Sequence, residues 1–249
     1  MTKNMETNNK KYNIIKAESR GHAEHGWLDT YHSFSFANYH DPQRIHFGAL
    51  RVLNDDKIIG GEGFGKHPHD NMEIVTIPIK GDLRHGDSMG NTTVIKEGDI
   101  QVMSAGTGIF HSEVNNNPDK CVELLQIWII PNKQSVDPRY GQITLDIEKM
   151  KNRFQQVLSP NREDDGVWIY QDAWFHMGDL DKNFNGKYQL KKSGNGVYVF
   201  LIEGVITVDE HRLNKRDAIS VKETNDIEIL AEQPSKVLII EVPLKLYTK

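Results

Sequence analysis

The sequence predicts an all-β protein built from two antiparallel β-barrels in tandem. Short runs rich in isoleucine and valine recur along its 249 residues, and turn signals that contain glycine separate them. Many short strands with regular turns are typical of a sandwich or barrel, whereas alternating helix and strand patterns would predict a parallel sheet. The order of strands and turns is similar in the two halves of the chain, which favours two domains.

Nine segments have the length and composition of strands. They lie at residues 72–79, 92–95, 100–103, 122–130, 197–202, 205–208, 218–221, 227–230 and 237–242. Glycine-containing turns at Gly81, Gly98, Gly196 and Gly204 mark strand ends. Two regions, residues 29–39 and 145–156, have a weak helical pattern instead.

A faint internal repeat sets the predicted domain bounds. In each half, a strand that ends in glycine is followed by a turn before an aspartate and then by strands that end at a proline, Pro131 or Pro243. The polar segment 131–139 contains two prolines and is typical of a linker. We therefore predict a polar tail over residues 1–11, a first barrel over 12–133 and a second barrel over 134–249.

Composition excludes several classes of protein. A single cysteine forms neither an internal disulfide nor a cysteine-rich zinc site. The net charge of −5 argues against direct nucleic-acid binding, which normally needs a basic surplus. No apolar stretch approaches the roughly 20 residues of a membrane span, and the polar N-terminus lacks the apolar core of a signal peptide. We expect a cytoplasmic protein that binds no membrane.

The histidines are concentrated in the first half, since 9 of the 11 lie within residues 1–111. His67 and His69 are separated by one residue, so both imidazoles point to the same face of an extended segment. His111 and Glu113 repeat this spacing after a glycine-rich turn. Two such pairs on neighbouring strands would form a site with three nitrogen ligands and one oxygen ligand.

That donor set predicts a site for one divalent transition metal. Mixed nitrogen and oxygen ligands suit iron, manganese, nickel, cobalt, copper or zinc. Four protein ligands on an octahedral ion would leave two positions for substrate or O₂, whereas a closed tetrahedral site would be structural. The sequence therefore points to a site that performs chemistry.

The residues around these pairs resemble a known superfamily. The segment from Gly61 to Gly81, which contains His67, His69 and Glu73, is similar to the first motif of the cupins. The segment from Gly98 to His111 resembles the second cupin motif more loosely. It has Ser104 where a proline is usual and two extra residues before the histidine.

These departures, together with Glu113 just after His111, resemble the pirin branch of the cupins. Further stretches similar to bacterial pirin-like proteins lie at residues 20–22, 36–39, 87–91 and 126–131. The second half resembles the family in strand pattern only. The resemblance implies a bicupin fold of two double-stranded β-helix domains.

In pirins the metal is held by three histidines and the glutamate two residues after the third. The resemblance therefore implies His67, His69, His111 and Glu113 as ligands, and Fe²⁺ as the expected metal. The resemblance implies a dioxygenase that opens the heterocycle of a flavonol such as quercetin with O₂ and releases CO. Glu113 would accept the proton of the flavonol 3-hydroxyl group as general base. The alternative is an iron-dependent redox sensor that binds a protein partner, either a transcription factor or a metabolic enzyme.

Two further sets of residues have competing interpretations. Glu73 either faces the site or, as we prefer, hydrogen-bonds an imidazole of it. The second set is a histidine cluster near the N-terminus. It forms either a pocket wall or lid or, as we prefer, a packed segment with its polar tips at the surface. Its members are His22, His25, His32, His40 and His46. Of these, His46 is the best candidate for contact with a metal-ligating side chain.

Three expectations remain. His85 and Asp87 follow a strand end and are expected in a solvated hairpin. Cys121 begins a strand and is expected to be buried and unreactive. Because the second half contains only His176 and His211, we expect the second barrel to bind no metal and to have a structural or gating role.

Overall fold

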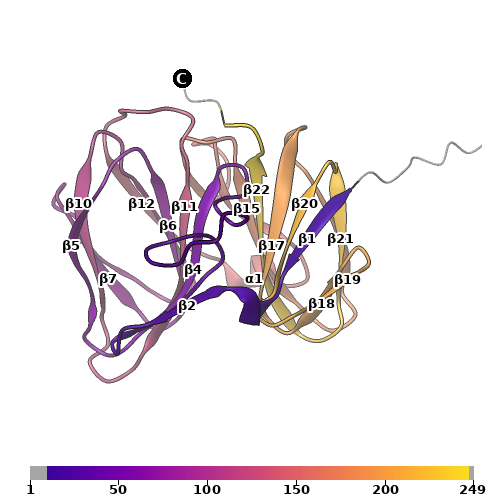
Figure 1. Cartoon of the computed structure of the whole chain (residues 1–249), viewed down its shortest axis with the longest axis horizontal. Coiled ribbons are helices and arrows are strands. Elements are labelled where there is room, and N and C mark those ends of the chain that lie inside the picture. The colour runs from indigo at the N-terminus through magenta and orange to yellow at the C-terminus, as the bar shows by residue number, and fades with distance from the viewer. Residues whose placement is uncertain (1–9, 247–249) are drawn as a thin grey trace, which may run out of the picture.

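Within residues 10–246, which the computed structural model describes, regular structure is almost entirely β-strand. The strands form four sheets, two of seven strands and two of four. Each half of the molecule has one large and one small sheet, and the halves lie side by side (Figure 1). The nearly all-β, two-part arrangement agrees with the prediction, whereas closure of each half into a barrel stays a prediction.

The first half contains the first large sheet and the first small sheet. The strands of the first large sheet are β2 (Gly21–Glu24), β3 (Leu28–His32), β4 (Leu50–Ile58), β6 (Glu73–Lys80), β9 (Asp99–Ser104), β11 (Val122–Ile129) and β12 (Arg139–Thr144). Their order is β12-β9-β6-β11-β4-β3-β2. The strands of the first small sheet are β5 (Gly63–His69), β7 (Leu83–Asp87), β8 (Thr92–Ile95) and β10 (Ile109–Asn115), in the order β5-β10-β7-β8.

The second half repeats this division. The strands of the second large sheet are β1 (Lys11–Ile15), β13 (Gln155–Ser159), β14 (Val167–Trp168), β15 (Trp174–Leu180), β17 (Asn195–Glu203), β20 (Ala218–Lys222) and β22 (Ser235–Pro243). Their order is β1-β20-β17-β22-β15-β13-β14. The strands of the second small sheet are β16 (Asn185–Gln189), β18 (Val205–Val208), β19 (His211–Asn214) and β21 (Asp226–Ala231), in the order β16-β21-β18-β19.

The two large sheets share the main hydrophobic core of the molecule. This core joins Leu53 and Ile127 of the first half to Phe200 and Ile240 of the second. The opposite face of each large sheet packs on its own small sheet through a separate cluster. A strand between two such cores is apolar on both faces, which explains the unbroken apolar runs in the sequence. The face of the strand that a residue occupies therefore decides which of the two cores its side chain enters.

Each of the nine predicted strands overlaps an observed strand, but one predicted helical region is wrong. Residues 29–39 contain most of β3, where Thr30 and His32 pair with Asp56 and Asn54 of β4. Cross-strand pairing outweighs the weak helical pattern there. In residues 145–156 the helix α1 covers only Ile147–Met150, with β13 following it.

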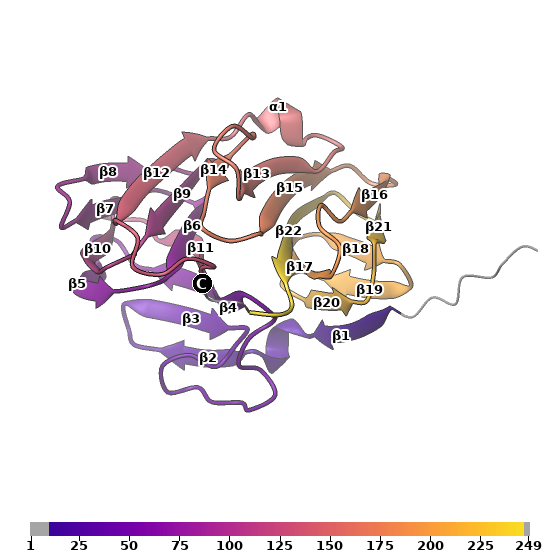
Figure 2. The ribbon, with the colours of Figure 1, turned by 90° about the horizontal axis from the view of Figure 1, so that it is seen from above.

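Strand pairing joins the two predicted domains at two places within residues 10–246, beyond the shared core. β1 pairs with β20, and β12 pairs with β9, so a strand from each predicted domain completes a sheet of the other (Figure 2). The boundary at residues 133/134 stays a prediction. Residues 1–9 of the predicted tail lie outside the described residues, and β1 begins at Lys11. No helix within residues 10–246 is long and apolar enough to cross a membrane.

The buried side chain of His176 makes the folding stability depend on pH. It lies on β15, is 4% exposed, and packs with its ring centroid 4.8 Å from that of Tyr188. Burial, followed by the charge of Lys191, lowers its pKa to about 3. The unfolded chain binds a proton at this position below its ordinary pKa of 6.5, whereas the folded protein does not until about pH 3. This contribution to stability is therefore complete above pH 6.5 and is lost as the pH falls toward 3.

We expect the His176→Phe variant to lose less stability on acidification than the wild type. The difference in slope should reach up to about 1.4 kcal/mol per pH unit between pH 6 and 4, because one fewer proton is taken up on unfolding. Urea unfolding of both proteins across this range measures it. Parallel stability curves for the two proteins would contradict the prediction.

Candidate metal centre

β5 and β10 position the predicted histidine ligands at one end of the first small sheet. The two strands are antiparallel, with His67 opposite His111 and His69 opposite Ile109. The centroids of the His67 and His111 rings lie 4.4 Å apart, and each lies 4.9 Å from the His69 ring. One donor nitrogen from each ring lies within 4.8 Å of the others. The structure thus brings together the three histidines that the spacing singled out.

A glycine lets the two strands approach closely below these rings. A Cβ atom on Gly63 would collide with the backbone carbonyl oxygen of Glu113. A bulge between His111 and Glu113 shifts the pairing, so that Glu113 lies opposite Phe64. Bulges re-aim side chains beside functional sites.

The three imidazoles fit a metal ion chemically. His111 is 2% exposed, and neither of its ring nitrogens has a hydrogen-bond partner among residues 10–246. Burial, followed by the nearby His67, lowers the pKa of His111 to about 3; burial, followed by the nearby His111, lowers that of His69 to about 4. Both rings are therefore neutral near pH 7 and offer lone pairs to a cation. A buried imidazole without partners is costly unless a ligand satisfies it.

His67 is oriented by its own strand. Its Nδ1 lies 2.7 Å from the carbonyl oxygen of Gly65, to which it donates when that nitrogen carries the proton. Its Nε2 is then left with a lone pair. A hydrogen bond that fixes one nitrogen while the other faces a metal is common among histidine ligands.

Glu113 is buried and held by two side chains of the first large sheet. Thr76 Oγ1 on β6 donates to Oε1 at 3.1 Å, and Gln126 Nε2 on β11 donates to Oε2 at 2.7 Å. Donor atoms of Glu113, His111 and His85 lie within 4.8 Å of one another. The four predicted ligands therefore fall into two overlapping groups that share His111.

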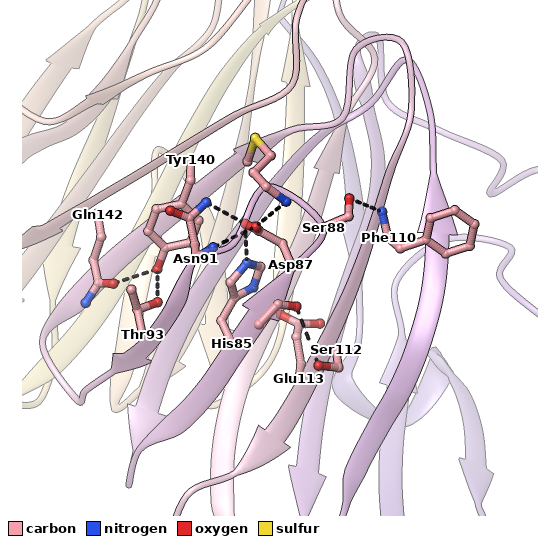
Figure 3. A network of polar contacts seen from close by, with 12 residues as sticks. His85, Asp87, Ser88, Asn91, Thr93, Phe110, Ser112, Glu113, Tyr140 and Gln142 are labelled. Carbon is pink, nitrogen blue, oxygen red and sulfur yellow. Dashed lines mark hydrogen bonds and ion pairs between the residues drawn. The ribbon is translucent and has the colours of Figure 1, made fainter.

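The sequence interpretation placed His85 wrongly. It is fully buried on β7 instead of lying in a solvated hairpin, and β7 pairs with β10 so that His85 lies opposite Glu113. Its Nε2 lies 3.1 Å from the carboxylate of Asp87, and the tilted ring of Tyr140 lies beside its ring with centroids 4.9 Å apart (Figure 3). The i, i+2 spacing of His85 and Asp87 was the available signal, since it matches the spacing of the other two pairs.

Asp87 anchors this arrangement. Its Oδ1 accepts from the backbone amides of Met89 and Asn91, and its Oδ2 accepts from the side chain of Asn91 (Figure 3). These hydrogen bonds and that of His85 lower the pKa of Asp87 despite the opposing effect of burial. A carboxylate fixed in this way holds the orientation of the His85 ring.

Glu73 does not contact the imidazoles, so both interpretations of it are wrong. It is 1% exposed and accepts a hydrogen bond from Ser104 Oγ at 2.7 Å. On β6 it shares a face with Val75 and Ile77, which point into the core between the large sheets. Thr76 occupies the other face, toward Glu113. Burial raises the pKa of Glu73 to about 7.

A cavity of about 680 Å³ opens beside His67, His69 and Glu113. Its walls are mostly apolar, with aromatic side chains at Trp27, Phe36, Tyr39, Phe64 and Trp128. The Trp128 ring lies edge-on to His69, with centroids 4.9 Å apart. An apolar cavity with a few convergent polar groups is typical of a small-molecule site.

The N-terminal histidine cluster divides between the two interpretations. His22, His25 and His32 line the cavity, as expected of a pocket wall. His46 does not line it; this side chain is exposed, and its Nδ1 lies 2.8 Å from the carbonyl oxygen of Gly48, so the proposed contact with a metal-ligating side chain is wrong. Cys121 is half-buried and lies just before β11, so its predicted burial is also wrong.

The fold and the site together define a class: β-proteins of two similar halves, in which a cluster of imidazoles beside a cavity could hold a metal ion. The family model described as pirin matches residues 14–129, and the model described as quercetinase C-terminal cupin domain matches residues 156–242. The chain belongs to the pirin family.

Several relatives match almost their full length. Quercetin 2,3-dioxygenase of Escherichia coli K12 is 41% identical over 92% of this chain and 98% of its own. A pirin-like protein of Caulobacter vibrioides is 37% identical over 89% of this chain and 95% of its own. The crystal structure of the bacterial pirin YhhW of E. coli in complex with nickel(II) is 39% identical, covers 94% of this chain and 99% of its own, and superposes with a TM-score of 0.89.

Proposed function

We propose that this protein is a metal-dependent dioxygenase that opens the heterocycle of a flavonol such as quercetin with O₂ and releases CO. The observation that carries the proposal is His111, a buried imidazole with both ring nitrogens unpartnered among residues 10–246, set between two other histidines beside an aromatic-walled cavity. The names of the relatives, quercetin 2,3-dioxygenase among them, support the same chemistry.

In this proposal His67, His69, His111 and Glu113 hold one divalent transition metal. Fe²⁺ is our first choice, and manganese, nickel, cobalt, copper and zinc share the preference for such donors. When bound, the metal supplies Lewis acidity that lowers the pKa of a phenolic hydroxyl group and allows chemistry with O₂.

The side chains of this chain prepare the substrate for that chemistry. Glu113 accepts the proton of the flavonol 3-hydroxyl group, while Thr76 and Gln126 hold its carboxylate in place. The aromatic walls at Phe64 and Trp128 accommodate flat rings and exclude water. His85, fixed by Asp87, packs its ring 5.4 Å from that of His111 and limits how that ligand can turn.

The direct test is O₂ consumption and CO release with quercetin, measured on protein loaded separately with iron, manganese, nickel, cobalt and copper. We expect turnover with at least one metal and none after chelation. Lack of turnover by every fully loaded form would overturn the proposal. A regulatory role with a protein partner and a cytoplasmic location stay predictions from the sequence.

A further inference from the structure

A row of polar side chains crosses the first large sheet on the face toward the cavity. Gln126 of β11 is the cross-strand partner of Thr76 on β6 and of Asn54 on β4, and Asn54 is in turn the partner of His32 on β3. Directly paired residues of adjacent strands point to the same face. On the other side of Thr76 the row continues to Gln101 of β9, and Glu113 of the small sheet accepts hydrogen bonds from Thr76 and Gln126.

The members of this row differ in how their polar atoms are satisfied. Beside Glu113, Thr76 and Gln126 bond to Glu113 and to each other. At the His32 end, Asn54 Oδ1 and His32 Nδ1 are buried and have no hydrogen-bond partner among residues 10–246. Asn54 is 4% exposed and His32 is 3% exposed, and both line the cavity. Buried polar atoms without partners are rare in native proteins. Where they line a cavity, as these two residues do, a water molecule or a bound ligand can complete the bonding.

The surroundings of Asn54 and His32 determine which of their atoms can donate or accept a hydrogen bond. Burial, then the charges of His22, His25 and Arg20, lower the pKa of His32 to about 4, so the ring is neutral near pH 7 and offers one donor and one acceptor. Asn54 Oδ1 is an acceptor. Thr30 and Asp56, the next cross-strand pair on the same face of the sheet, already bond to each other. Phe36 and Tyr39 pack beside His32.

We propose that Asn54 and His32 form a polar subsite in the cavity wall that binds hydroxyl groups on the part of an aromatic ligand remote from Glu113. Asn54 lies one strand beyond Gln126 and His32 two strands beyond it, which places His32 about 10 Å from Gln126 across the sheet. A phenolic hydroxyl group donates to Asn54 Oδ1 and accepts from the N–H group of the neutral His32 ring. A wholly apolar ligand of the same shape would leave both residues unpaired.

This inference rests on the proposed function in placing the reacting end of the ligand at the metal site, and it deepens that proposal by naming what selects the substrate. An aromatic wall alone holds any flat ring of suitable size. The polar pair discriminates between polyhydroxylated and unsubstituted flavonols. It thus assigns substrate preference to two residues of the first large sheet that lie outside the cupin motifs.

The test compares the binding of two flavonols under nitrogen, so that no turnover occurs. 3-Hydroxyflavone keeps the 3-hydroxyl group of quercetin and lacks its other four. Quenching of tryptophan fluorescence measures Kd, because Trp27 and Trp128 lie in the cavity wall. The proteins are the wild type, Asn54→Leu and His32→Phe, all loaded with the same metal.

We expect quercetin to bind the wild type more tightly than 3-hydroxyflavone. Each substitution should weaken quercetin binding about three- to tenfold more than it weakens 3-hydroxyflavone binding, the worth of a net hydrogen bond. The 3-hydroxyflavone measurement is the matched control in each variant, since it reports whether the cavity is intact. A ratio of the two Kd values that stays as in the wild type in both variants would overturn the inference, as would a wild type that binds neither flavonol.

Oxygen consumption, measured separately in air, distinguishes this inference from the proposed function. If the variants lose the preference for quercetin and no metal-loaded form takes up O₂, the polar subsite is supported and the proposed dioxygenase activity is contradicted. O₂ uptake together with an unchanged Kd ratio would support the dioxygenase and remove the subsite.

Discussion

Replacing His111 with alanine is expected to abolish metal binding, because His111 belongs to both groups of converging donor atoms. The first group is completed by His67 and His69, and the second by His85 and Glu113. Loss of even a residue that merely orients a ligand typically weakens metal affinity 10–100-fold, so loss of this shared ligand should cost more than about 100-fold. Elemental analysis of the purified variant should find far less than one metal ion per chain.

The thermal stability of the same variant provides a second readout. In the metal-free protein, alanine removes an imidazole whose nitrogens have no partner among residues 10–246, which offsets part of the cost of the cavity it leaves. The metal-free variant should therefore melt close to the metal-free wild type. A ligand that binds only the folded state raises Tm, and that rise should disappear in the variant.

His211 supplies a matched control for this prediction. It lies on β19 in the second half, outside both donor groups, with its ring centroid 4.4 Å from that of Tyr12. The His211→Ala variant should keep its metal and the rise in Tm. Equal metal content in the His111→Ala variant and the wild type would show that the ion binds somewhere else.

Replacing Glu113 with glutamine is expected to lower kcat by about 10²- to 10⁴-fold, the usual contribution of a general base. The amide has nearly the same shape, and its oxygen still accepts from Gln126 while its NH₂ group donates to the Thr76 hydroxyl. The local packing is thus retained, and the group that takes the proton is removed. Rates of O₂ consumption with quercetin, divided by bound metal, separate this effect from any loss of the ion.

Glu73 is the matched carboxylate for this experiment. It lies in the same motif segment as His67 and His69, but it faces the core between the large sheets and bonds to Ser104. Its pKa is raised to about 7 by burial, so the protonated form already exists near neutrality and an amide is a mild change there. The Glu73→Gln variant should keep its kcat. A Glu113→Gln enzyme with wild-type kcat per metal ion, or equal losses in both variants, would contradict the role assigned to Glu113.

Sequence reasoning found nine of the 22 strands within residues 10–246, together with the three converging histidines, because both signals are local. Isoleucine and valine runs bounded by glycine turns define strands without knowledge of their partners. The i, i+2 spacing of His67 and His69 places two imidazoles on one face of any extended chain. The concentration of histidines in the first half of the chain and their scarcity in the second half were likewise visible in the sequence alone.

What the tertiary structure decided was which face of each strand looks toward the site. Alternation groups Glu73 with Val75 and separates it from Thr76, but only the packing of the two large sheets shows that Thr76 faces the carboxylate and Glu73 does not. Similarly, His85 became part of the site through the pairing of β7 with β10. The polar row that ends at Asn54 and His32 depends on the register of strands that are distant in sequence. Register is a long-range property, set by the burial of whole sheets, and no local pattern contains it.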